Sequence, residues 1–473
     1  MDGKLPFVLT TVLTVILSGC ANNLRSSVRP LQSALGGEYE TYQPPAGALA
    51  VPSDAPESVE PNGEITLPQA LSLALMHNPE LAAFSFEIRA AEAMALQAGL
   101  WPNPEVGVAI ENVGGTDEVS GLDGPATTIQ LGQLIELSDK RTKRHRVALL
   151  QGALAGWDYE AKRLDVLRQV AQAYIELLAA QRGVELASDL VQLSEQTYTT
   201  VAERVEAGKD SPVEKTKAQV ALANAGIELK KATRRLEAAR KELVTTWGGK
   251  QPKFGRATGD IEEVDPVPEE DTLVALLPQN PAIARWETEL EERRAVVDLE
   301  KARAVPDPTV LGGYRRFNDT GDRAFVFGLA IPLPITDRNQ GAIQASKFNL
   351  AKVYKQRQAA EAATYAAFAG AYETLSAAYA EVMDIRNIVL PGSQSAFEAT
   401  RQGYQEGKFD FLTVLDSQRT LFDARQRYLD AQASYHRAKA AVESLIAQEI
   451  DERLVRRDFS TLPGVRETKA QSR

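Results

Sequence analysis

A long heptad pattern of small and aliphatic residues dominates the first half of the chain. Its positions recur at alternating steps of four and three: Val166, Val170, Ala173, Leu177, Ala180, Val184 and Ala187. This spacing predicts a helix that packs lengthwise against other helices. We expect it to run from about Arg141 to Ala207, which is on the order of 100 Å at 1.5 Å per residue. A return helix is expected from Pro212 to Trp247, closing a helical hairpin over 141–248.

A second helical hairpin is expected over residues 340–450, with a kink at Pro391. Placing Gly208 on Gly407 (407 − 208 = 199) also aligns further identical residues in the two halves: Lys209 with Lys408, Gln219 with Gln418, Leu222 with Leu421 and Ala225 with Ala424. We therefore interpret the chain as an internal duplication, with hairpin tips near residues 208 and 407. Both tip glycines fit turns that need a positive φ.

Shorter helices are predicted before each long hairpin. Thr66 is expected to cap the first of them, with Pro68 in its first turn. The dipeptide Asn78-Pro79 interrupts that helix, and a second helix follows it. Asn280-Pro281 repeats the same break in the second half.

Two β hairpins, at 104–137 and 308–335, are predicted from apolar residues at every second position. These are Val106, Val108 and Ile110 in the first, and Phe325, Phe327, Leu329, Ile331, Leu333 and Ile335 in the second. Alternation over about ten residues fits a transmembrane β-strand, but it also fits a soluble hairpin on a core. After the N-terminal run, no stretch of 18 apolar residues remains for a spanning helix. If the strands span a membrane, several copies must combine them, because four strands cannot close a barrel alone.

The N-terminus predicts export. An apolar run of 13 residues, 5–17, follows Lys4; it is too short to cross a bilayer and fits a signal peptide. The sequence Leu17-Ser18-Gly19-Cys20 resembles the lipobox of bacterial lipoproteins, so residues 1–19 would be removed and Cys20 lipidated. An ordinary secreted protein with a free cysteine is the alternative. Residues 20–63, rich in Pro, Ser, Gly and Ala, are expected to form an extended tether.

Composition removes several classes of function. Among 473 residues, 64 are acidic and 53 basic, and a net charge of −11 argues against a nucleic-acid partner. One cysteine and three scattered histidines exclude an intramolecular disulfide framework and argue against a zinc cluster. We expect no catalytic site, no cofactor and no bound metal. An enzyme and a purely structural periplasmic spacer are the competing classes, and the spacer does not explain the alternating strands.

The order of these features over residues 64–450 resembles the TolC-like family of outer-membrane efflux ducts. The likeness is strongest at the second tip, in Gly407 and the run Leu412-Thr413-Val414-Leu415-Asp416. Residues 96–104, 111–115 and 133–141 resemble the heavy-metal branch of that family, the cobalt-zinc-cadmium type. The branch would make the protein a passive exit duct for metal cations. A duct for drugs or other organic compounds, or for type I protein secretion, is the alternative.

The resemblance implies a mainly α fold with a small β part, built from repeats at 64–250 and 251–450 and a flexible tail at 451–473. It also implies a homotrimer in the outer membrane of a Gram-negative bacterium. Its helices would form a periplasmic α-barrel joined to a 12-stranded β-barrel in outer-membrane lipid. The expected partners are a periplasmic adaptor and a proton-driven inner-membrane pump.

Specific residues follow from the same resemblance. The family has a D-x-x-D pattern at the second tip that narrows the periplasmic mouth; here Asp416 matches, and Thr413 replaces the first aspartate. A solvent-facing helix carboxylate is the competing interpretation of Asp416. Five residues at the tips are expected to contact the adaptor: Gly208, Lys209, Gly407, Lys408 and Phe409.

Overall fold

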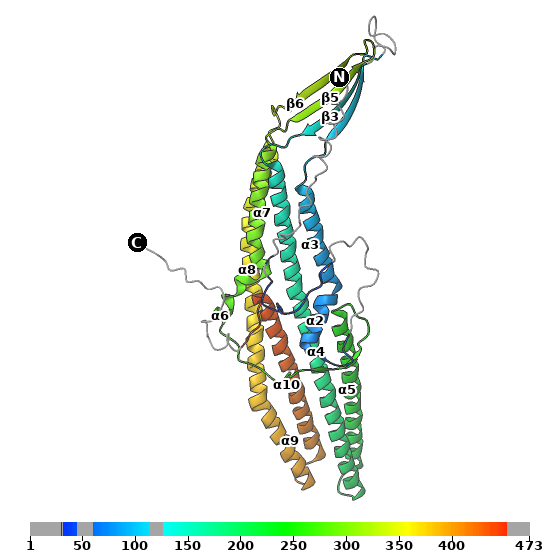
Figure 1. Ribbon diagram of the computed structural model, residues 1–473. Helices are drawn as coiled ribbons and strands as arrows, with labels where there is room; N and C mark the ends of the chain where they lie inside the picture. The colour runs from blue at the N-terminus through cyan, green and yellow to red at the C-terminus, as the bar shows by residue number, and fades with distance from the viewer. Residues whose placement is uncertain (1–29, 31, 45–59, 114–125, 452–473) are drawn as a thin grey trace, which may run out of the picture. The chain divides into compact units, whose positions relative to one another are not determined.

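The computed structural model describes residues 30, 32–44, 60–113 and 126–451 (Figure 1). The predicted signal peptide and Cys20 lie outside these residues. The described chain divides into two compact units. The first contains Ala90–Ala153 and Arg294–Ser346, and the second contains Pro30–Arg89, Leu154–Arg293 and the chain from Lys347 onward. Each unit therefore takes segments from both sequence repeats.

The first unit carries an antiparallel sheet of four strands (Figure 1): β2 Glu105–Glu111, β3 Ala126–Leu134, β5 Thr309–Phe317 and β6 Arg323–Ala330. The strand order is β2-β3-β5-β6, so the two hairpins meet through β3 and β5. Within the described residues, β2 and β6 each have one edge without a strand partner. Such edges pair readily with strands of other chains.

One face of this sheet is apolar and exposed. Rows of facing residues cross the strands on it: Val108, Ile129, Tyr314 and Phe325 in one row, and Val106, Leu131, Gly312 and Phe327 in the next. Phe325 is 72% exposed and Phe327 is 83% exposed. The opposite face is more polar, and there Arg315 pairs with Glu111 and donates to Thr128 Oγ1 at 2.8 Å. An exposed apolar face of this size needs another apolar surface to cover it.

The predicted return strand to Ile335 is too long. Strand β6 ends at Ala330, and the segment that follows is irregular. Pro332 and Pro334 explain this end, because proline has no N–H to donate to a neighbouring strand. Leu333 and Ile335 remain exposed in the irregular segment.

All the helices except α6 lie close to their predicted ranges: α2 Leu67–His77, α3 Pro79–Ala98, α4 Lys140–Glu206, α5 Pro212–Thr245, α7 Pro281–Arg303, α8 Gln340–Asp384, α9 Leu390–Gln405 and α10 Phe411–Ile446. The short helix α6, Glu270–Val274, was not predicted. A short 3₁₀ helix, Leu277–Gln279, precedes α7. None of the described helices contains a stretch both long and apolar enough to cross a bilayer. The predicted heptad seam is confirmed in α4, where Val170 and Leu177 are fully buried.

The second long helix changes its hydrogen-bonding pattern just before Pro391, the residue at which a kink was predicted. Residues Ile385–Val389 form one π-helical segment between α8 and α9, and Leu390 N–H donates to Ile385 O. Pro391 follows at once, and it cannot donate to the preceding turn. Two residues after Pro391, the Ser393 hydroxyl donates to Val389 O at 2.7 Å. The first hairpin has no such break, since α4 is continuous over 67 residues.

Between the two long hairpins the structure contains a strand that the sequence pattern did not predict. β4, Phe254–Thr258, pairs in parallel with β1, Gly63–Thr66. Residues 20–63 were expected to be an extended tether, yet the described part at 32–44 packs on α4. Arg163, which is fully buried, donates to Leu35 O at 3.0 Å and Gly36 O at 3.1 Å. A buried guanidinium needs such acceptors, and the backbone of this segment supplies them.

Both Asn-Pro breaks make the same tertiary contact. Asn78 Oδ1 accepts from Leu81 N at 2.9 Å, and its Nδ2 donates to Thr246 O at 2.8 Å. Asn280 Oδ1 accepts from Ala282 N, and its Nδ2 donates to Leu445 O, both at 2.8 Å. Each asparagine therefore begins one helix and holds the end of the return helix of its own repeat.

Replacing Asn78 or Asn280 by alanine should lower the free energy of unfolding by about 1–3 kcal/mol, because each change removes a helix cap and leaves buried backbone groups unpaired. The urea midpoint of the purified protein measures this loss. Asn224→Ala is the matched control, since Asn224 is exposed on α5. Equal midpoints for all three variants would contradict the prediction.

Candidate functional site: the paired helical tips

Both long hairpins of the second unit turn at a glycine. Gly208 has φ +69 and Gly407 has φ +75, as their sequence context predicts. Open space surrounds both positions, so the backbone conformation rather than crowding calls for glycine. After each glycine a polar side chain caps the return helix: Ser211 Oγ accepts from Val213 N, and Asp410 Oδ1 accepts from Thr413 N.

A polar tie joins the two tips. Tyr404, at the end of α9, donates its hydroxyl to Asp210 Oδ2 at 2.5 Å. Arg204, at the end of α4, donates to both oxygens of the same carboxylate, from Nε at 2.6 Å and from Nη2 at 3.0 Å. The Arg204 guanidinium also lies 4.5 Å from the centre of the Tyr404 ring. One carboxylate thus connects the first hairpin to the second.

The tie is stable at neutral pH. The hydrogen bond from Arg204 lowers the pKa of Asp210, and the hydrogen bond from Tyr404 lowers it further. Burial raises the pKa of Tyr404, and the Asp210 carboxylate adds to that rise. A carboxyl group with a lowered pKa stabilises the folded state above its ordinary pKa and loses this effect as the pH falls through the lowered value. The tie therefore persists across the physiological range.

An apolar cluster lies against the tie and draws on all four long helical segments: Val201 on α4, Ala218 on α5, Phe397 and Tyr404 on α9, and Phe411, Val414, Leu415 and Leu421 on α10. The Tyr404 and Phe411 rings lie 6.1 Å apart between centroids. Burial of these side chains supplies most of the attraction between the tips.

The residues predicted to contact an adaptor are on the surface. Gly208, Lys209, Gly407 and Lys408 are exposed, and Lys408 Nζ pairs with Glu406 at 2.6 Å. Phe409 is 47% exposed, and its ring fills the space where a Cβ on residue 403 would lie. The tips therefore present two lysines and part of one aromatic ring to solvent.

Thr413 and Asp416, predicted to act together, have different environments. Thr413 donates both its N–H, at 3.0 Å, and its hydroxyl, at 2.5 Å, to Asp410 Oδ1. It thus completes the cap of α10. The Asp416 carboxylate is exposed and bonds to no described residue. Asp423 and Asp430, one and two heptads further along α10, are exposed as well.

Sequence reasoning missed Arg204, Asp210 and Tyr404. Asp210 and Tyr404 are 194 residues apart in the chain, and no local motif links them. The available signal was weak: an acid follows the first tip glycine by two residues, and an aromatic residue precedes the second by three.

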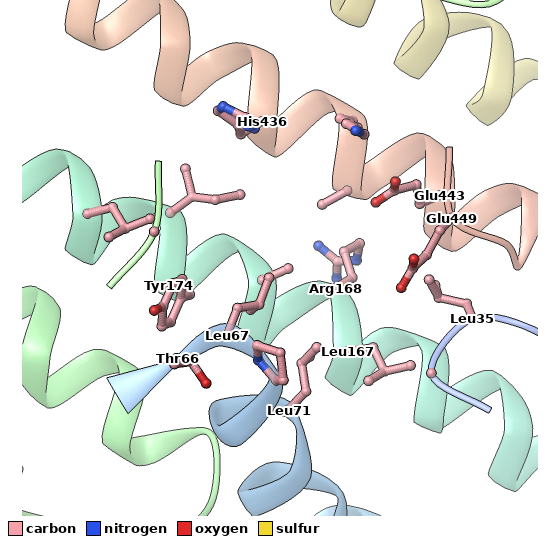
Figure 2. A pocket seen from close by; sticks show the side chains of 18 of the residues that line it. Leu35, Thr66, Leu67, Leu71, Leu167, Arg168, Tyr174, His436, Glu443 and Glu449 are labelled. Atoms are coloured by element: carbon pink, nitrogen blue, oxygen red, sulfur yellow. The ribbon is translucent and has the colours of Figure 1, made fainter. Parts of the chain in front are cut away.

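The second unit also contains a largely apolar pocket of about 520 Å³ (Figure 2). Segment 35–39, α2, α4 and α10 line it. Two of its charged groups have protein partners: Arg168 bonds to Asp165 at 2.6 Å, and Glu443 accepts from Ile450 N at 2.9 Å. Burial raises the pKa of Glu443 to about 7. This arrangement holds the end of α10 and offers no convergent set of ligand groups.

The described residues contain no group of three or more His, Cys, Asp or Glu side chains arranged to hold a metal ion. Neither the tips nor the pocket brings a nucleophile and a base together. The arrangement at the tips can hold two hairpins together and present charge to solvent.

Comparison with known proteins agrees with this geometry. The profile of the outer membrane efflux protein family matches residues 70–249 and 272–448, one stretch in each repeat. The chain is 34% identical over 414 residues to the cobalt-zinc-cadmium resistance protein CzcC of Cupriavidus metallidurans, covering 88% of this chain and 97% of CzcC. It is 28% identical over 280 residues to the nickel and cobalt resistance protein CnrC of the same organism, covering 59% and 65%.

A solved structure of CusC, from work on folding and transmembrane channel formation, has the same fold. It superposes with a TM-score of 0.69 at 18% identity, over 81% of this chain and 92% of CusC. At that identity the likeness concerns the fold alone.

Tyr404→Phe should loosen the tips, because it removes a charge-assisted hydrogen bond worth about 1.5–3 kcal/mol. Spin labels at Lys209→Cys and Lys408→Cys would report this as a longer and broader distance distribution. Tyr428→Phe is the control, since the Tyr428 hydroxyl bonds to no described residue. An unchanged distribution in Tyr404→Phe would show that the apolar cluster alone holds the tips.

Proposed function

Since this chain belongs to the outer membrane efflux protein family, we propose that it is the outer-membrane exit duct of a tripartite system that exports heavy-metal cations. The observation that carries the metal assignment is the similarity to CzcC along nearly the whole of both chains. The duct itself performs no reaction; it offers a passive path for cargo delivered by a pump.

The sheet supports a place in lipid for the first unit. Its exposed apolar face suits hydrocarbon, and its polar face, with Glu111, Thr128 and Arg315, suits a water-filled lumen. Open strand edges are not tolerated in a bilayer, so copies must join β2 to β6. Three copies would contribute 12 strands to one barrel. We therefore propose a homotrimer, with the helices forming the periplasmic α-barrel.

The tips are the proposed contact with the periplasmic adaptor. Gly208, Lys209, Gly407, Lys408 and Phe409 form the exposed ends of both hairpins, and the lysines suit an acidic or carbonyl-rich partner. The adaptor would connect the duct to a proton-driven inner-membrane pump. We further propose that Cys20, outside the described residues, is lipidated and anchors the chain to the outer membrane.

Asp416 is the proposed constriction residue of the mouth. It is free of partners among the described residues and lies about two turns beyond the cap of α10. Three copies around an axis would form a ring of carboxylates that attracts cations. Thr413 would border this ring but add no charge, because its side chain is neutral; its hydroxyl donates to Asp410.

A strain that lacks this protein should become sensitive to a few metals among zinc, cobalt, cadmium, nickel, copper and silver, because export would stop at the outer membrane. Growth on graded concentrations of each metal, beside dyes, detergents and antibiotics, measures this. The intact gene should restore resistance. Sensitivity to organic compounds alone would contradict the metal assignment and favour the drug or protein-secretion alternative. The assignment of the protein as an outer-membrane duct would still hold.

Asp416→Asn should lower the cation-to-anion permeability ratio of the reconstituted channel several-fold, because it removes the proposed ring of charge. Reversal potentials in a salt gradient across a planar bilayer measure the ratio. Glu203→Gln is the matched control: Glu203 is also an exposed carboxylate near a tip. The same ratio in both variants and the parent would identify Asp416 as an ordinary surface charge.

A further inference from the structure

Two arginines lie side by side at the end of the sheet that points away from the helices. Arg316 is the second-last residue of β5 and Arg323 is the first residue of β6, and the two are directly paired across the strands. Only the turn 318–322 separates them, whereas the other ends of these strands lead to α7 and α8. Figure 1 shows β5 and β6 next to each other in the sheet. Both arginines are exposed.

Both side chains belong to the apolar face of the sheet. The register pairs Tyr314 with Phe325 and Arg316 with Arg323. Residues two positions apart on a strand point to the same face. The arginine pair is therefore the next row after the aromatic pair, whose ring centroids lie 6.3 Å apart. The apolar face thus ends, on these two strands, in a row of two positive charges.

Arg315, the neighbour of Arg316 on the same strand, provides a comparison. Its side chain lies on the polar face, where it pairs with Glu111 and donates to Thr128 Oγ1 at 2.8 Å. Arg316 and Arg323 have no such partners: within the described residues, no carboxylate lies within ion-pair distance of either guanidinium. The sheet therefore provides acceptors for the arginine on its polar face and leaves the pair on its apolar face without any.

The two acids of the turn do not neutralise the arginine pair. Phe317 N–H donates to Asp322 O at 3.0 Å, so strand pairing extends to the residue before Arg323. Asp322 is at the alternate position to Arg323, and this places it on the side of the polar face. Asp319 Oδ1 accepts from Thr320 N–H at 2.8 Å, within the turn itself. The charge of the arginine pair is thus available to a group outside the chain.

The geometry of the pair suits an anion with several oxygens. Like charges directly opposite each other in a sheet are destabilising, and an anion between them removes the repulsion. Cross-strand partners have Cβ atoms roughly 5 Å apart, so both guanidinium groups can reach one small anion. A phosphate monoester has three free oxygens and a charge of about −1.5 to −2 at neutral pH, which matches two guanidinium groups. Each guanidinium can donate paired hydrogen bonds to such a group.

The position of the pair in the sheet indicates that the phosphate belongs to a lipid. An arginine on the lipid-facing side of a barrel is costly in hydrocarbon and nearly neutral at the level of the headgroups. Tyr314 and Phe325 form the preceding row, and aromatic residues mark the border between hydrocarbon and headgroups. In the proposed function the helices are periplasmic, so the turn between β5 and β6 faces the cell exterior. The arginine pair would then lie among the headgroups of the outer leaflet.

We propose that Arg316 and Arg323 together bind a phosphate monoester of a lipid in the outer leaflet of the outer membrane. The phosphate receives hydrogen bonds from both guanidinium groups, and the acyl chains of the same lipid cover Tyr314, Phe325 and the apolar rows beyond them. The inference rests on the proposed function, which places the sheet in lipid. It adds a binding site on the outer surface of the sheet and the chemical class of its ligand.

Lipid binding by the purified full-length protein in detergent tests the proposal. The probe is lipid A, a glycolipid with phosphate monoesters, and native mass spectrometry counts the bound lipid at graded concentrations. The parent should bind this lipid at least about tenfold more tightly than lipid A from which the phosphates have been removed. The double variant Arg316→Gln/Arg323→Gln should bind both forms alike, because its neutral side chains offer no charge to the phosphate.

Two further variants separate the arginine pair from charge in general. Arg419→Gln/Arg427→Gln removes the same charge from exposed positions on α10 and should keep the preference for the phosphorylated lipid. Arg316→Lys/Arg323→Lys retains the charge but loses the planar fork of donors, so its affinity should lie between those of the parent and the glutamine variant. Bound lipid A should also raise the unfolding temperature of the parent more than that of the glutamine variant.

Equal binding of both forms of lipid A by the parent would overturn the site. Tighter binding of phosphatidylglycerol, a phosphodiester, would overturn the monoester as its ligand. Displacement of lipid A by millimolar inorganic phosphate would overturn the lipid and assign the pair to free phosphate. Conductance of the same preparation in a planar bilayer separates these results from the duct. A parent that conducts without a phosphate preference would overturn the site alone, whereas a parent that forms no channel would contradict the duct as well.

Discussion

The structure depends on one constraint, which is that very long helices are stable only where neighbours run beside them. A helix of 67 residues such as α4 exposes far too much backbone and apolar surface to stand alone, and intrinsic propensity does not compensate for it. The heptad spacing around Val170 and Leu177 meets this requirement, because it places one row of side chains in continuous contact with a neighbouring helix. The hairpin turns and the Asn-Pro contacts at Asn78 and Asn280 follow from the same requirement for lateral packing.

The two halves of the duplicated chain share the same helical hairpin, but they carry different side chains at its tip. The tip glycines and lysines correspond, but Asp210 in the first tip corresponds to Phe409 in the second, so only the first offers a carboxylate to Tyr404. The helix break is likewise confined to the second half, at the π-helix before Pro391. The positions that correspond to Arg204 and Tyr404 are occupied by Gly403 and Val205, so the tie can form in one direction only. Divergence after duplication thus provides the asymmetric contact that holds the tips together.

Local pattern sufficed for the elements whose cause is local. The heptad pattern predicted the long helices, and the alternation of apolar residues predicted the strands. The capping signal at Thr66 and the prolines predicted helix ends to within a few residues. The features that could not be predicted from the sequence depend on contacts between segments far apart in the chain. Strand β1 needs a partner, β4, that lies in the other repeat, and the packing of residues 32–44 depends on the buried Arg163. The tie at Asp210 is of the same kind. The predicted range of strand β6 was too long because the alternation of apolar residues continues past Pro332. A proline cannot donate a backbone hydrogen bond to a neighbouring strand, so the strand itself ends earlier.

In the proposed duct, the exposed acidic groups near the tips would favour cations without selecting among them. Most acidic groups near the tips are engaged, as Asp210 is by Arg204 and Asp410 by Thr413, while Asp416, Asp423 and Asp430 stay exposed along one side of α10. Exposed carboxylates at heptad intervals attract cations, yet a single carboxylate provides too few ligands to discriminate between zinc, cobalt and nickel. Weak, repeated attraction also lets an ion leave as readily as it enters, which conduction requires. In the proposed system, discrimination among metals would therefore belong to the component that loads the duct.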